Sequence, residues 1–176
     1  MDSTCNDTSG GLPFAGSLKG TSMRLETPGD AVFLLELYTS TRQVEMDLTG
    51  WSVETRRMFI AMQFHAMRSA YAAQFPSAKF SIVLQDGLPV GRMVANWDPG
   101  EIRIVDLALM PGARNLGIGG RLLRELTLEA SQARTPLRLH VLRHSRAINL
   151  YHRLGFVTTA ESEIYRTMEW QPSGNP

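Results

Sequence analysis

A glycine-rich stretch with a single arginine, Pro111 to Gly120, comes directly before a segment with helical periodicity. Glycine can adopt positive φ, and without a Cβ it lets an anion approach the main-chain N–H groups. The free N–H groups and the positive dipole end at the start of a helix also attract phosphate. Arg114 can add a charge-assisted hydrogen bond. The stretch therefore predicts a phosphate or pyrophosphate site, with a glycine-rich turn that binds nothing as the alternative.

The spacing of these glycines excludes two common phosphate-binding motifs. A P-loop needs Gly-Lys-Ser/Thr, and no such sequence follows Gly117 or Gly120. A dinucleotide-binding fingerprint needs a third glycine three residues after Gly119, where Leu122 stands. The remaining pattern is Arg-x-x-Gly-x-Gly, formed by Arg114, Gly117 and Gly119.

Two segments together resemble the GNAT superfamily of N-acetyltransferases. The first, "LALMPGARNLGIGGRLL", is similar to the coenzyme-A-binding core of that superfamily. The second, "RAINLYHRLGF", is similar to a later signature in which a helix carries a tyrosine followed by Leu-Gly-Phe. The two motifs occur in the expected order, separated by a helix and a strand, which makes the pair more specific than either motif alone. The resemblance implies acetyl-CoA as the cosubstrate.

The resemblance also assigns residues to the cosubstrate. The strand before the glycine stretch would pair its backbone with the pantetheine arm, and the start of the helix would bind the pyrophosphate. Asn149 would contact the cosubstrate as well. Many relatives have an asparagine seven residues before the tyrosine, whereas this chain has His144, which leaves that pantetheine contact in doubt. The other expected cosubstrate-binding residues are Leu107, Ala108, Leu109, Arg114, Asn115, Leu116, Gly117, Ile118, Gly119 and Gly120.

Tyr151 corresponds to the family tyrosine that protonates the departing thiolate. A phenol suits that role because it stays protonated at neutral pH and donates a hydrogen bond. The alternative is a half-buried core tyrosine on an amphipathic helix. The acceptor amine must lose a proton before it attacks, and Asp106 and Glu101 are the candidate bases, with a water chain as a third option. No Cys or His spacing predicts a metal site.

The predicted elements form one α/β domain. The family resemblance implies a mixed, mostly antiparallel and twisted central sheet with helices on both faces. Residues 1–20 are expected to be a flexible leader, 21–171 the acetyl-CoA-binding domain and 172–176 a tail. Hydrophobic periodicity and turn signals predict strands at 21–27, 79–85, 89–97, 101–110 and 136–142, helices at 31–43, 52–74, 119–134 and 145–156, and a closing hairpin at 157–170.

Composition narrows the range of partners and compartments. The net charge of +1 gives no electrostatic footprint for nucleic acid or an anionic membrane. No apolar run reaches the roughly 18 residues of a membrane span, and the N-terminus lacks the pattern of a secretory signal. Cys5 is the single cysteine, so no disulfide forms within the chain, which fits a reducing compartment. We therefore expect a cytoplasmic protein.

The sequence favours an N-acetyltransferase that transfers acetyl directly to a primary amine in a ternary complex. Two alternatives stay open: a non-catalytic acyl-CoA-binding regulatory module of the same fold, and a nucleotide-binding protein. The acceptor could be a small molecule, a peptide or a protein lysine, and a homodimer is a candidate assembly. Aromatic and acidic residues of the first two helices and their connection could bind a cationic amine or simply pack in the core: Tyr38, Glu45, Asp47, Trp51, Phe59, Gln63 and Phe64.

Overall fold

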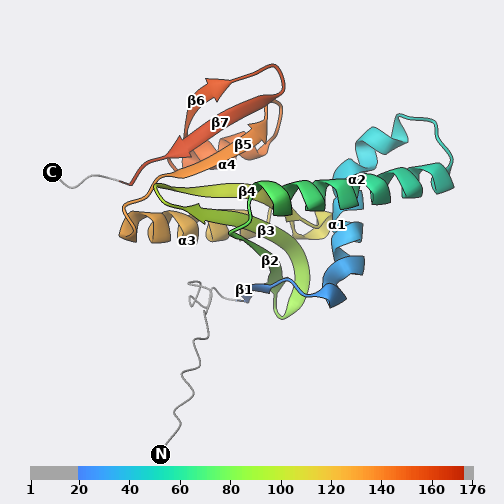
Figure 1. The fold of residues 1–176 in the computed structure, drawn as a ribbon, viewed down its shortest axis with the longest axis horizontal. Helices are drawn as coiled ribbons and strands as arrows, with labels where there is room; N and C mark the ends of the chain where they lie inside the picture. Colours follow the sequence, from blue (N-terminus) through green and yellow to red (C-terminus); the bar gives the residue numbers. More distant parts are fainter. Residues whose placement is uncertain (1–19, 173–176) are drawn as a thin grey trace, which may run out of the picture.

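The computed structural model describes residues 20–172, which form a seven-stranded sheet with four α-helices (Figure 1). The strand order is β1-β2-β3-β4-β5-β7-β6, and only the β4–β5 pair is parallel. The predicted fold class, a mostly antiparallel α/β sheet in a single domain, is confirmed. The elements are β1 (Thr21–Leu25), η1 (Pro28–Asp30), α1 (Ala31–Asp47), α2 (Val53–Gln74), β2 (Ala78–Gln85), β3 (Leu88–Asp98), β4 (Glu101–Leu109), η2 (Pro111–Ala113), α3 (Ile118–Gln132), β5 (Leu137–Leu142), α4 (Ala147–Arg153), β6 (Val157–Glu161) and β7 (Tyr165–Trp170).

Local sequence signals explain most of these boundaries. Ser52 caps α2 by accepting a hydrogen bond from the Thr55 N–H. Asp86 and Gly87 both have positive φ and form the tight turn between β2 and β3 that the sequence predicts. Helix α1 runs one turn beyond its predicted end, to Asp47.

Two hydrophobic cores lie on the two faces of the sheet. One contains α3 and α4 residues packed on the central strands, and the other contains α1 and α2 residues packed on β2. Ile82 and Val83 of β2 are both fully buried and belong to opposite cores, as the alternation of side chains along a strand requires. The helices thus cover both faces of the sheet.

The β4–β5 pair is the irregular part of the sheet. Its parallel pairing covers three residue pairs and ends at Ile104–Leu139. On its other edge, β4 stays paired with β3 as far as Leu109, with one register shift at which Val105 has no partner. β5 stays paired with β7 as far as Leu142. The sheet therefore opens between the C-terminal halves of β4 and β5.

The predicted leader, apart from Gly20, and the predicted tail beyond Pro172 lie outside the described residues. Within residues 20–172, the helices are too short or too polar to cross a membrane.

Candidate functional site

The opening between β4 and β5 leaves main-chain groups without sheet partners. From Asp106 onward, the edge of β4 that faces β5 has no strand pairing among residues 20–172. In sheets with parallel strands, ligands bind where the C-terminal ends of such strands diverge. Leu107, Ala108 and Leu109, the residues expected to pair with an extended ligand, occupy this edge.

Helix α3 begins at the same end of the opening. Asn115 and Gly117 both have positive φ, at 62° and 79°. Gly117 is the N-cap of α3, and the first turn holds neither a side-chain cap nor an acidic residue. The first N–H groups of α3 therefore have no side-chain acceptor in the described part of the chain, and the helix dipole places positive potential there. A bound anion would accept hydrogen bonds from these N–H groups and would be stabilised by the positive potential.

The glycines of this loop have different roles. Gly117 is needed for its backbone conformation, because side-chain-bearing residues rarely adopt that φ. A Cβ on Gly120 would lie 3.4 Å from the Leu150 side chain of α4, which is ordinary van der Waals contact at its close end. A Cβ on Gly119 would lie in ordinary contact distance of both Leu150 and Leu109.

Three arginines surround the start of α3, and sequence reasoning found only Arg114. Its Nε donates to the Leu109 carbonyl at 2.9 Å. Arg121 donates to the Thr21 hydroxyl at 3.0 Å, and its Nη1 lies 4.0 Å from the Cβ position of Gly117. The guanidinium of Arg124 lies 3.6 Å from the Cβ position of Gly120.

These three side chains form no ion pair within residues 20–172, unlike most other arginines of the fold. The signal for Arg121 and Arg124 was present in the sequence, because side chains in the first turns of a helix lean back toward its N-terminus.

A buried ion pair lies beside the opening. Arg92 of β3 is 3% exposed, and its Nε donates to Asp106 Oδ2 at 2.9 Å, with a second contact from Nη2. Arg92 Nη2 also lies 3.8 Å from the sulfur of Met67 on α2. Sequence reasoning missed Arg92, although an arginine inside the apolar run of β3 signals a buried charge that needs an acidic partner.

Tyr151 of α4 completes the cluster. It is 8% exposed and packs edge-on against Phe156. Burial, together with the negative charge of Asp106, raises the pKa of Tyr151 to about 12. Tyr71 of α2 lies within the same electrostatic environment, since burial and then the charge of Asp106 raise its pKa too. The charge of Asp106 thus acts on both Tyr151 and Tyr71, while the catalytic roles of Tyr151 and Asp106 stay predictions.

Glu101 lies at the opposite end of β4 from the opening. Asp106 comes five positions after Glu101, a distance of roughly 16 Å along a strand. Burial opposes its ionisation, but hydrogen bonds from Arg103 and Arg138 outweigh that effect and lower the pKa of Glu101. The structure does not bring Glu101 to Tyr151, and its ion pairs favour a structural role.

The other expected site residues are spread around the opening. His144 lies exposed in the turn that follows β5, and Asn149 lies exposed on α4. Their cosubstrate contacts stay predictions. The acidic residues expected near an amine are already paired, Glu45 with Arg42 and Asp47 with Arg56.

Tyr38 and Phe64 pack against each other with ring centroids 5.6 Å apart in the core between α1, α2 and β2. For these two residues the core alternative fits the structure better than an amine pocket.

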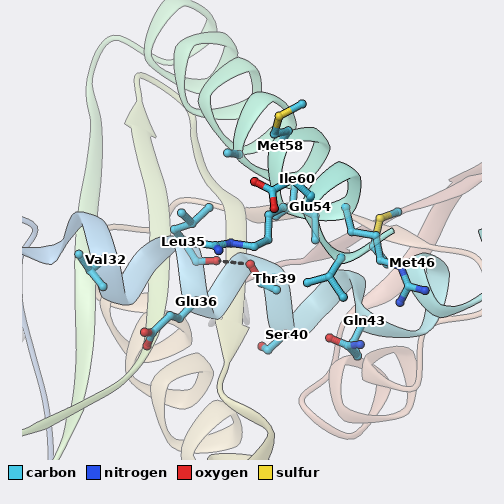
Figure 2. Close-up of a pocket in the computed structure, with 14 residues that line it drawn as sticks. Val32, Leu35, Glu36, Thr39, Ser40, Gln43, Met46, Glu54, Met58 and Ile60 are labelled. Atoms are coloured by element: carbon cyan, nitrogen blue, oxygen red, sulfur yellow. Dashed lines mark hydrogen bonds between the residues drawn. The ribbon is translucent and has the colours of Figure 1, made fainter. Parts of the chain in front are cut away.

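A large groove lies elsewhere, between α1 and α2, with a volume of about 910 Å³ (Figure 2). Its lining residues come from these two helices alone, and Tyr151, Asp106 and Arg92 are absent from it. The groove is therefore separate from the opening in the sheet. Among the described residues, no cluster of three or more His, Cys, Asp or Glu side chains could hold a metal ion.

Comparison with known proteins was made by sequence and by fold. A family model described as a GNAT acetyltransferase domain matches residues 76–158. No curated protein sequence gives a significant match. Many solved structures share the fold.

Three of these structures show the range of similarity. The PaiA N-acetyltransferase of Thermoplasma acidophilum, in complex with coenzyme A, has a TM-score of 0.65 and 18% identity, covering 86% of this chain and 98% of that one. A GNAT family acetyltransferase of Elizabethkingia anophelis with bound acetyl-CoA has a TM-score of 0.58 and 16% identity, covering 88% and 99%. The ribosomal-protein-S5-alanine acetyltransferase of Vibrio fischeri has a TM-score of 0.60 and 14% identity, covering 89% and 96%.

Proposed function

We propose that this chain is an acetyltransferase of the GNAT type and that it transfers the acetyl group of acetyl-CoA to a primary amine; the family model that matches residues 76–158 supports this. The observation that carries the proposal is the position of Tyr151 and the Asp106–Arg92 pair beside the opening between β4 and β5, with the start of α3 at the same end. This arrangement combines an anion site, an extended free strand edge and a buried proton donor.

The free edge of β4 and the start of α3 suit the two ends of coenzyme A. Pantetheine amides can hydrogen-bond to the main chain of Leu107 to Leu109 in the manner of an added strand. The pyrophosphate can accept hydrogen bonds from the N–H groups between Asn115 and Gly120. We include Arg121 and Arg124 with Arg114 as phosphate ligands, because all three guanidinium groups lie at the loop without an acidic partner among the described residues.

Chemistry then takes place beside Asp106 and Tyr151. The acceptor arrives as an ammonium ion and loses one proton before its nitrogen attacks the thioester carbonyl carbon. The C–N bond forms, the C–S bond breaks, and Tyr151 gives its proton to the leaving sulfur. The nitrogen loses a second proton as the amide forms, which allows the phenol to be restored and releases one proton overall.

Asp106 is the residue that we assign to proton removal from the amine, directly or through water. Its carboxylate lies near Tyr151, and its remaining oxygen carries no hydrogen bond from Arg92. A negative charge at this place also attracts the cationic acceptor toward the thioester. Direct transfer needs no acyl-carrying residue.

An acceptor screen tests this function. Purified protein is incubated with acetyl-CoA and single members of several amine classes, including small polyamines, aminoglycosides, peptides with free N-termini and lysine-containing peptides, while free thiol is measured. Amine-dependent thiol release with a matching acetylated product by mass spectrometry is the expected result. Thiol release that does not depend on any amine, or an acetylated hydroxyl product, would contradict the assignment of a primary amine as the acceptor.

A further inference from the structure

The groove between α1 and α2 has an apolar floor and lies open to solvent. Figure 2 shows the side chains of both helices that line it. Val32, Val53 and Met58 at this surface are 71%, 74% and 67% exposed. Leu35 and Ile60 lie deeper and are partly or fully buried. Exposed apolar side chains that gather along one groove offer a contact surface to a partner.

The groove faces away from the sheet. Leu34, Leu37 and Tyr38 are buried residues of α1 that repeat at helical spacing along one side of the helix, whereas Met46, the fourth buried residue of α1, lines the groove. Val32, Leu35 and Thr39, which line the groove, lie on the other side. An occupant of the groove would therefore cover α1 and α2 from outside, without entering the opening at Tyr151.

Charged residues at this surface have both signs and no partners in the described fold. Glu36, Glu54 and Arg57 line the groove, are exposed and form no ion pair within residues 20–172. Nearby helix charges are paired, as in Arg56 with Asp47. A patch that carries both signs is complementary to itself when two copies meet about a twofold axis, where each positive group faces a negative group of the other copy.

We propose that two copies of this chain associate through the groove between α1 and α2 in a twofold-symmetric homodimer. Met58 of each copy fills the apolar floor of the other, a role that suits the flexible methionine side chain. Arg57 of each copy pairs with Glu36 of the other. Apolar burial supplies the free energy of association, and the exchanged ion pairs fix the register of the helices.

The size of the surface sets the expected affinity. Helix α1 has 17 residues and is about 26 Å long. Two helices side by side are roughly 20 Å wide, which gives a contact on the order of 500 Å² per copy, below the ~800 Å² of a standard interface. A contact below the standard size is typical of weak, transient association, so we expect the dimer to dissociate readily on dilution.

Sedimentation velocity over a roughly hundredfold range of protein concentration tests the dimer. The wild-type protein should shift from the mass of one chain to the mass of two. Met58→Glu should stay monomeric, because a charge would be buried in the groove. Met58→Leu should still dimerise. Leu128→Glu is the matched control, since Leu128 of α3 is similarly exposed, at 61%, and lies outside the groove.

A charge exchange tests the register. Arg57→Glu should weaken association at least fivefold, and combining it with Glu36→Arg should restore it. A wild-type chain that is monomeric at every concentration overturns the proposal, as does a Met58→Glu variant that dimerises normally. A monomer that instead binds uncharged lipid vesicles through Met58 would assign the groove to a membrane surface and overturn it too. These readouts measure mass and vesicle binding, so they are independent of acetyl transfer.

Discussion

At the scale of single residues, the environment of Tyr151 determines what it can do. A phenol in water titrates near pH 10, but burial beside the charge of Asp106 raises the pKa of Tyr151 to about 12. The raised pKa keeps the proton on the phenol throughout the physiological range. A thiolate leaving group is a stronger base inside the opening than in water, because desolvation disfavours its charge. Tyr151 is thus suited to donate a proton and unsuited to act as a base.

The Tyr151→Phe variant should lower kcat about a hundredfold, because it removes the proton donor and keeps the ring that packs on Phe156. The KM for acetyl-CoA should change little. Steady-state kinetics and calorimetric binding of coenzyme A measure the two effects separately. In the wild-type protein, kcat should show no loss between pH 7 and roughly pH 10 from ionisation of this phenol. Unchanged kcat in the variant would remove Tyr151 from the mechanism.

The Asp106–Arg92 pair supports the fold and, in the proposed mechanism, the chemistry as well. Asp106→Asn leaves the buried guanidinium of Arg92 without its counter-charge, so the free energy of unfolding should fall by about 3 kcal/mol. Urea unfolding measures this loss. The double variant with Arg92→Met should be more stable than Asp106→Asn alone, because it no longer buries an unpaired charge. Equal stabilities of the single and double variants would contradict the coupling.

At the scale of elements, α3 positions the proposed phosphate site, and its first two turns hold more cationic groups than the glycine motif indicates. Arg121 and Arg124 extend back along the helix to Gly117 and Gly120. The main-chain N–H groups give the site its geometry, while the guanidinium groups add positive charge.

Arg121→Gln and Arg124→Gln should each raise the Kd for coenzyme A roughly tenfold, because each removes one charge-assisted contact to phosphate. Isothermal titration calorimetry at low and moderate salt measures the effect, and the salt dependence of binding should become weaker in both variants. Arg134→Gln is the matched control, since it removes an arginine just beyond the other end of the same helix. Equal losses in all three variants would point to a general effect of charge.

The elements that sequence reasoning predicted well are those whose signals are local. The glycine loop, the helix after it and the turn at Asp86–Gly87 each depend on neighbouring residues, and the structure contains all three. The helix begins at Ile118, one residue before its predicted start. Arg92 and Tyr71 were missed because they come from β3 and α2 and meet Asp106 only after the chain folds. The periodicity of a single helix or strand does not indicate which residues of other elements it will contact.

The predictions that the structure refines also involve non-local contacts. Sequence spacing could not separate Gly117, which needs its positive φ, from Gly120, whose Cβ position lies in contact distance of Leu150 of α4. Glu101 and Asp106 lie on one strand, but the ion pairs of Glu101 with Arg103 and Arg138 distinguish them only in the folded sheet.

At the scale of the whole molecule, the sheet consists of two parts that meet along a short seam. β1 to β4 form one antiparallel part, and β5, β7 and β6 form the other. Three parallel residue pairs and the ion pair between Glu101 and Arg138 join them directly. The core under α3 and α4 spans both parts. A ligand that fills the opening beyond the seam would therefore contact both parts of the sheet at once.

Coenzyme A should consequently stabilise the protein strongly against heat. A ligand at about a hundred times its Kd adds about 2.7 kcal/mol to the free energy of unfolding, which corresponds to a rise in Tm of roughly 5–10 °C for a chain of this size. Differential scanning fluorimetry with increasing coenzyme A measures the shift. ATP is the matched control, because it offers phosphates to the start of α3 but has no pantetheine arm to lie along β4, so its shift should be much smaller. Equal shifts with ATP and coenzyme A would mean that the opening between β4 and β5 does not bind pantetheine, and no shift with coenzyme A would contradict cosubstrate binding at this site.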